Sequence, residues 1–142
     1  MQDTFIVKDQ VKIQAPAAKV WEVLTNPAYM RQWEEMPENF GDEYLQQGSV
    51  INYEGFSRLT VTTFEVNKLL VLTVYLPNVD MDPDAYNIAY RFILLPDNDQ
   101  TVLDFEIGDF APVPNGQQYY DMSVQFAETS LQKIMSLSEQ NA

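Results

Sequence analysis

Few side chains in this sequence could carry acid–base or metal chemistry. The 142 residues contain no histidine and no cysteine, which excludes Ser–His and Cys–His nucleophile systems, thiolate metal sites and disulfides. The five glycines are scattered and do not form a phosphate-binding loop. We therefore expect no catalytic residue, no metal ion and no cofactor, and an enzyme is the less favoured class of function.

One acidic segment has carboxylates at alternating positions, Asp80, Asp82 and Asp84, as at the start of a calcium-binding loop. Counted from Asp80, the sixth residue is Ala85, where such a loop needs glycine. The twelfth is Arg91, where the loop needs glutamate. We therefore predict an acidic turn between strands and no metal site.

Aromatic and apolar residues are the candidates for binding chemistry. A tyrosine on a buried wall has an apolar ring and one hydroxyl group, which can orient a ligand by a single hydrogen bond. The alternative is that these residues are ordinary core. The candidate ligand-binding residues are Tyr53, Tyr75, Tyr90, Phe92, Phe105, Tyr120, Val124, Ala127 and Leu131.

Charged residues near a strand break are a weaker candidate for a pocket mouth. Glu54 and Arg58 flank Gly55, and loops on a rigid sheet often carry binding residues. The alternative is an exposed hairpin with solvated charges.

The first part of the chain predicts a strand followed by two short helices. Residues 5–13 alternate apolar and polar side chains, as a strand does, and Val20, Trp21 and Leu24 then follow at helical spacing. Pro27 ends that helix, because proline disfavours the helical conformation in the residue before it, and it can begin a second helix.

The middle of the chain predicts antiparallel strands. Residues 43–110 show period-two alternation with breaks at glycine, asparagine and proline. In the clearest hairpin, a four-residue loop pairs Leu95 with Gln100, which places Arg91 opposite Asp104 as a surface ion pair.

Residues 114–140 predict a long helix with a wide apolar stripe. Asn115 and Gln118 have the spacing of a capping box, and Tyr120, Ala127 and Leu131 lie on one side. The economical arrangement is a curved antiparallel sheet folded round this helix, in one domain over residues 1–142.

Composition limits the partners. Eight basic and 21 acidic residues give a net charge of −13, which opposes binding to nucleic acid or to an anionic membrane surface. The chain shows no leader peptide and no membrane-spanning stretch. We expect an acidic cytoplasmic protein.

The residues Ala15-Pro16, Val20-Trp21, Leu24-Thr25-Asn26-Pro27 and Trp33 resemble the opening motif of the START-like superfamily, also called SRPBCC or helix-grip proteins. Within it, the chain most resembles the bacterial homologues of the heat-shock chaperone ATPase activator, the AHSA-like branch. The resemblance extends over nearly the whole chain. It implies an α+β helix-grip fold with a cavity between the sheet and the C-terminal helix.

Three functions follow from this resemblance. The first is non-enzymatic binding of a small hydrophobic ligand, such as a lipid, in that cavity. The second is an interaction with a chaperone. The third is an enzyme of the cyclase or aromatase type, in which a tyrosine or a buried glutamate acts as acid or base.

Overall fold

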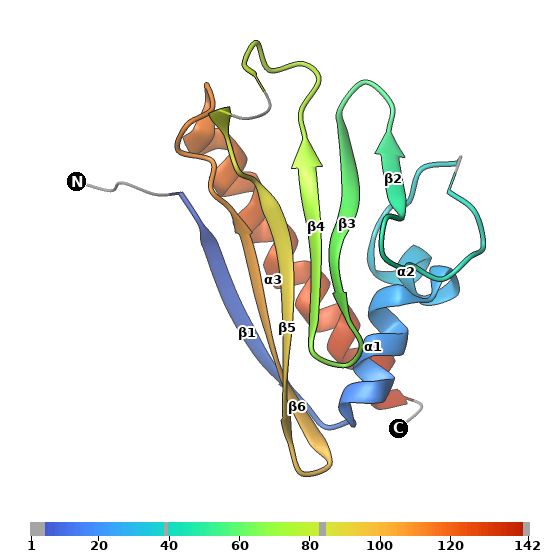
Figure 1. The fold of residues 1–142 in the computed structure, drawn as a ribbon. Helices are drawn as coiled ribbons and strands as arrows, with labels where there is room; N and C mark the ends of the chain where they lie inside the picture. The colour runs from blue at the N-terminus through green and yellow to red at the C-terminus, as the bar shows by residue number, and fades with distance from the viewer. Residues whose placement is uncertain (1–4, 39, 83–84, 141–142) are drawn as a thin grey trace.

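Six antiparallel strands form one sheet in the order β1-β6-β5-β4-β3-β2 in the computed structural model, which describes residues 5–38, 40–82 and 85–140. Figure 1 shows the long helix α3 along one face of the sheet. The predicted class, a curved antiparallel sheet with a long C-terminal helix and two short helices after the first strand, is confirmed. The elements are β1 (Val7–Ile13), α1 (Ala17–Thr25), α2 (Pro27–Trp33), β2 (Val50–Tyr53), β3 (Ser57–Glu65), β4 (Leu69–Tyr75), β5 (Ala89–Asp97), β6 (Gln100–Gly108) and α3 (Gly116–Gln140).

Asn26 and Pro27 separate the two short helices, as the sequence predicts. The backbone of Asn26 is extended, and its side-chain oxygen accepts a hydrogen bond from the Ala28 N–H at 3.0 Å, which caps α2. Pro27 occupies the first turn of α2, where no N–H is needed. The Trp33 indole N–H donates to the Val23 carbonyl oxygen at 3.0 Å, and this bond ties α2 to α1.

The hairpin between β5 and β6 has a different register from the predicted one. Asp97, not Leu95, pairs with Gln100, so the loop has two residues in place of four. Asn98 has φ +58°, the left-handed conformation that short hairpin loops require. Arg91 consequently lies opposite Glu106, and its predicted position opposite Asp104 is wrong.

The predicted register is wrong because it places Pro96 in the loop. A proline inside a central strand would remove a ladder hydrogen bond. The Leu94 N–H donates to the Lys68 carbonyl oxygen at 2.9 Å. The nitrogen of Pro96, two residues later, points to the same side of β5. It lies beyond Leu69, the first residue of β4. No partner strand there needs the missing N–H, so β5 continues through Pro96.

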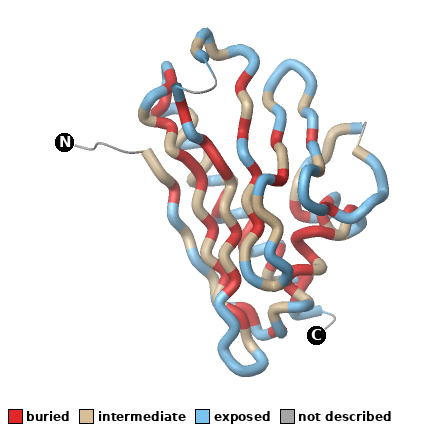
Figure 2. Tube along the Cα trace, in the orientation of Figure 1, coloured by how far each residue is buried: buried red, intermediate tan, exposed pale blue. Residues whose placement is uncertain are grey.

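The C-terminal helix fills the concave side of the sheet. Ala127, Leu131 and Ile134 are at most 2% exposed, and α3 packs against β1, β6, α1 and α2. Figure 2 shows buried residues along the strands and on α1. The expectation that α3 is held from more than one direction is confirmed.

The start of α3 differs from the predicted capping box. Asn115 has φ +61°, whereas an N-cap residue that bonds through its side chain normally has an extended backbone. Its carbonyl oxygen accepts hydrogen bonds from the N–H groups of Gln118 and Tyr119. The first turn is therefore held by backbone bonds.

No helix among residues 5–38, 40–82 and 85–140 combines the length and the apolar character needed to cross a membrane.

Candidate functional site

Three of the predicted aromatic residues lie together on the inner face of the sheet. The rings of Phe92 and Phe105 stack with centroids 4.2 Å apart, and Tyr90 meets Phe105 edge-on at 6.0 Å. The ring of Phe126 of α3, which was not among the candidate ligand-binding residues, lies 5.9 Å from the ring of Tyr90. These rings form an aromatic wall that joins the sheet to α3.

Other predicted residues lie elsewhere. Tyr75 pairs with the exposed Arg58 across β3 and β4, and the Arg58 guanidinium lies 4.9 Å from its ring centroid, so Tyr75 is on the outer face of the sheet. Tyr120 packs on Phe5 at 5.9 Å, near the start of α3. Glu54 is exposed.

The residues predicted on α3 take part in the core. Ala127 and Leu131 are buried in the same cluster as Phe92 and Phe105. Val124 is half-buried and packs against this cluster. All three therefore belong to the interior, as the alternative reading of ordinary core also requires.

A small cavity remains beside the aromatic wall. Its volume is about 10 Å³, enough for roughly one water molecule. None of the described residues of α3 lines it, so this cavity lies between the sheet and the two short helices and not between the sheet and α3, where the cavity was expected. The cavity is lined by Leu24, Met30, Trp33, Glu34, Leu45, Ile51, Leu59, Leu70, Leu72, Tyr90 and Phe92.

Glu34 is the one carboxyl group in this lining. It follows the last residue of α2, and its backbone N–H donates to the Met30 carbonyl oxygen at 2.9 Å. Its Oε1 accepts a hydrogen bond from the Tyr53 hydroxyl at 2.7 Å. Tyr53 shares the inner face of β2 with the buried Ile51, so this bond joins the end of α2 to the sheet.

Burial governs the protonation of this pair. It raises the pKa of Glu34 from 4.5 to about 7, although the hydrogen bond from Tyr53 acts in the opposite direction. Burial and the nearby Glu34 also raise the pKa of Tyr53 and of Tyr90 above the ordinary value of 10. Both tyrosines stay protonated at neutral pH, whereas Glu34 can exchange a proton there.

A groove of about 400 Å³ lies outside the cavity, between α2 and α3. Trp33 and Glu34 line both spaces and so form the wall between them. Phe126 lines the groove and touches Tyr90, which lines the cavity. The groove is lined by residues 31–35 and by Phe126, Thr129, Ser130 and Lys133.

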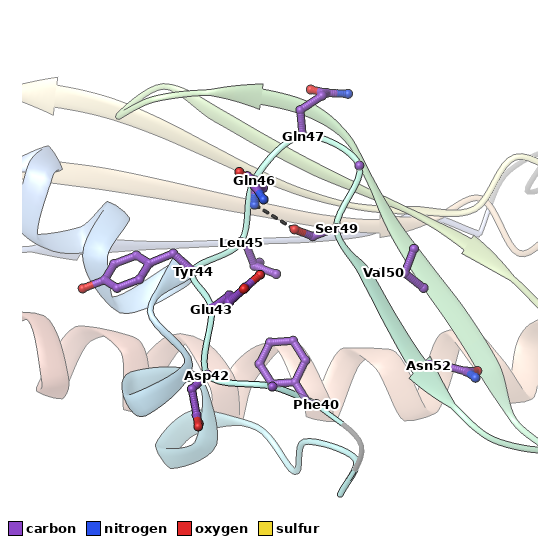
Figure 3. Close-up of a pocket in the computed structure, with 12 residues that line it drawn as sticks. Phe40, Asp42, Glu43, Tyr44, Leu45, Gln46, Gln47, Ser49, Val50 and Asn52 are labelled. Atoms are coloured by element: carbon purple, nitrogen blue, oxygen red, sulfur yellow. Dashed lines mark hydrogen bonds between the residues drawn. The ribbon is translucent and has the colours of Figure 1, made fainter.

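A second hollow, of about 560 Å³, lies under the loop at residues 40–52. Figure 3 shows that its side chains come from this one loop and the start of β2. Tyr44 points toward α1, where its hydroxyl donates to Glu22 Oε1 at 2.6 Å. The carboxylates that line this hollow, Asp42 and Glu43, are exposed, so it lacks a partly buried polar group of the kind that Glu34 gives to the groove.

The sequence predicts no metal site, and one structural observation concerns this prediction. No group of three or more His, Cys, Asp or Glu residues within the described part of the chain could hold a metal ion. Asp84 of the acidic segment lies outside the described residues.

Comparison with known proteins bears on the family. The family model described as Activator of Hsp90 ATPase homolog 1-like protein matches residues 14–139. The chain belongs to this AHSA1 family. The resemblance to the AHSA-like branch of the START-like superfamily is thereby confirmed.

Solved structures share the fold of this AHSA1 family member. Protein MLL2253 from Mesorhizobium loti is 22% identical, with a TM-score of 0.75 over 96% of this chain and 98% of that one. CalU16 from Micromonospora echinospora is 18% identical, with a TM-score of 0.69 over 92% and 71%. The Aha1 dimer from Colwellia psychrerythraea is 14% identical, with a TM-score of 0.67 over 94% and 96%. No curated protein matches the sequence.

Sequence reasoning about this AHSA1 family member missed Glu34. It begins the run Glu34-Glu35 after a helix, which is typical of a solvated helix end. A signal was nevertheless present, because Glu34 stands four residues after Met30 and continues the apolar stripe of α2.

Proposed function

We propose that the protein binds a small, mostly apolar ligand in the groove between α2 and α3, with Glu34 and Tyr53 as its polar anchor at the inner end. The observation that carries this proposal is the position of the Glu34–Tyr53 hydrogen bond, at the wall shared by the groove and the inner cavity. An aromatic wall with a few convergent polar groups is the usual composition of a ligand site.

The two volumes support the groove as the place of such a ligand. The cavity of about 10 Å³ holds no organic molecule. The groove of about 400 Å³ falls in the range of roughly 300–1,000 Å³ that ligand pockets occupy. The ligand therefore fills the groove first, with Phe126 beneath it, and goes deeper only as Trp33 and Glu34 move aside. Tyr90, Phe92, Phe105, Ala127 and Leu131 form the floor of the enlarged site.

A neutral fluorescent probe, N-phenylnaphthylamine, tests this proposal when titrated into the purified protein. Thr129 is exposed and lines the groove, so Thr129→Trp should fill the groove and abolish the fluorescence gain. Glu128 is exposed on α3 outside the groove lining, so Glu128→Trp is the matched control and should bind as the original chain does. Equal binding by both variants would rule out the groove as the site.

Acid–base catalysis is a second candidate, and the pKa of Glu34 favours it. A group with a pKa of about 7 can both take up and release a proton near neutral pH. Under this reading, ligands released from the purified protein by denaturation would include product as well as substrate, and Glu34→Gln protein would yield substrate alone. The same composition from both proteins would argue for binding without catalysis.

A chaperone interaction is a third candidate, favoured by the family description and by the surface charge. The net charge of −13 suits a basic partner surface. The test is the ATPase rate of the chaperone from the same cell. An unchanged rate at saturating concentrations of this protein would end the proposal.

A further inference from the structure

Glu34 is partly buried and has no basic partner among the described residues. Among the residues that the structure describes, ion pairs join Lys12 to Asp97 and Arg31 to Asp42, and none joins Glu34. A buried carboxylate that lacks a cation is costly. A bound ligand that carried a positive charge would supply the missing partner.

The charged groups around Glu34 do not supply it. Arg31, on the last turn of α2, also lines the groove, but its guanidinium is paired with Asp42 at 3.0 Å and donates to the carbonyl oxygens of Phe40 and Gly41. Lys133 of α3 and Glu35 line the groove, and both are exposed. From the sheet, Tyr53 and Tyr90 face Glu34 and stay neutral, since their pKa values are raised.

The walls beside the carboxyl group suit a cation. Trp33, Tyr90 and Phe92 line the cavity that Glu34 faces, and aromatic faces attract ammonium groups. A carboxylate can accept about four hydrogen bonds, and the Tyr53 hydroxyl supplies one. A protonated amine can therefore donate to Glu34 while Tyr53 remains in place, and such charge-assisted bonds are roughly twice as strong as neutral ones.

We propose, building on the ligand-binding function above, that the ligand is an apolar molecule with a protonated amine, which the Glu34 carboxylate holds at the inner end of the groove. A ligand with a carboxylate at that end would be repelled by Glu34. A ligand with a hydroxyl group at that end would bind without the electrostatic attraction to Glu34. The site thus selects among apolar molecules of equal size by the charge of one end.

Three probes of matched shape test this selection: phenylpropylamine, phenylpropanol and phenylpropionate, each titrated into the intact protein by calorimetry. The amine stays protonated below pH of about 9, while Glu34 ionises near pH 7. The affinity for the amine should therefore rise about tenfold from about pH 6 to about pH 8. The affinity for the alcohol should stay nearly constant, and the acid should bind weakest at about pH 8.

Two variants assign the effect to one carboxyl group. Glu34→Gln keeps the shape and the contact with Tyr53, and it should remove the pH dependence and lower the affinity for the amine about tenfold at about pH 8. The alcohol should bind this variant as well as before. Glu128→Gln removes the same charge from an exposed position outside the groove lining and should leave all three affinities unchanged.

The outcomes separate the two proposals. Equal binding of amine and alcohol, or an amine affinity that survives Glu34→Gln, overturns the amine inference while ligand binding itself stands. Binding of none of the three probes counts against both. Tighter binding of the acid than of the amine also overturns the inference and would point to Lys133 as the anchor.

Discussion

The two sides of the interior treat polar groups differently. On the α3 side, the buried Ser138 hydroxyl donates to the Ile134 carbonyl oxygen at 2.7 Å, and the apolar residues around it are almost completely buried. On the α2 side, an ionisable carboxyl group shares the wall with aromatic rings and relies on Tyr53. The first side is built for stability. The second holds an ionisable group at a partly buried position, where desolvation of the charged form costs stability.

The largest expected effect is on the α3 side. Leu131 is 2% exposed within the core cluster, so Leu131→Ala should lower the free energy of unfolding by about 2–5 kcal/mol. Urea denaturation at neutral pH measures this loss. A loss below about 0.5 kcal/mol, the scale of surface substitutions, would show that α3 lies loosely on the sheet and would remove the contrast between the two sides.

On the α2 side, replacement of Glu34 should raise the free energy of unfolding and not lower it. The pKa of Glu34 is raised from 4.5 to about 7 in the folded state, so its contribution to stability is complete below pH 4.5 and is lost as the pH rises through about 7. Glu34→Gln avoids that loss. At roughly 1.4 kcal/mol for each pKa unit, the variant should be more stable than the original chain by about 3 kcal/mol at about pH 8.

Urea denaturation of both proteins at about pH 4 and about pH 8 checks this prediction, because the gain should be present only at the higher pH. Glu35→Gln is the control for a general charge effect, since Glu35 is exposed. A gain of the same size at both pH values would mean that shape, and not ionisation, distinguishes the two side chains.

A smaller effect should follow from loosening α2. The Asn26 side chain accepts a hydrogen bond from the Ala28 N–H, and Asn26→Ala should cost about 1 kcal/mol. Because α2 positions Glu34, hydrogen exchange of the amides at residues 28–34 should also speed up. Unchanged exchange in this variant would show that the Trp33–Val23 bond alone holds α2.

The smallest effect should come from the surface. Lys12 and Asp97 form an ion pair at 3.6 Å, with both side chains more than half exposed, and such pairs contribute about 1 kcal/mol or less. Lys12→Gln should leave the thermal midpoint nearly unchanged. A loss as large as that of Leu131→Ala would contradict the view that stability lies in the core.

The sequence was sufficient for the elements that periodicity determines. The short helices around Asn26-Pro27, the strands and the stripe of Ala127 and Leu131 were all predicted, because one face of each element must be apolar to be buried. The hairpin register was wrong, since the place where β4 begins, and hence the tolerance for Pro96, depends on tertiary structure.

The site was harder to predict for a related reason. Tyr90, Phe92 and Phe105 come together because they share one face of two paired strands, which alternation reveals. Tyr75 is also a tyrosine, but the structure places it on the outer face of the sheet, with Arg58. Glu34 is partly buried because Tyr53 of β2 and residues of α3 lie near the end of α2. Its position on the stripe of Met30 is a local signal, but it does not reveal these contacts with distant segments.

The pKa of Glu34 tests the central claim most directly. The side-chain carboxyl carbon of Glu34 can be followed by nuclear magnetic resonance from acid to alkaline pH, with Glu34→Gln used to assign its signal. The account predicts a midpoint at about pH 7. A midpoint near 4.5, the ordinary value for glutamate, would mean that the carboxyl group is solvated and would contradict the proposed anchor.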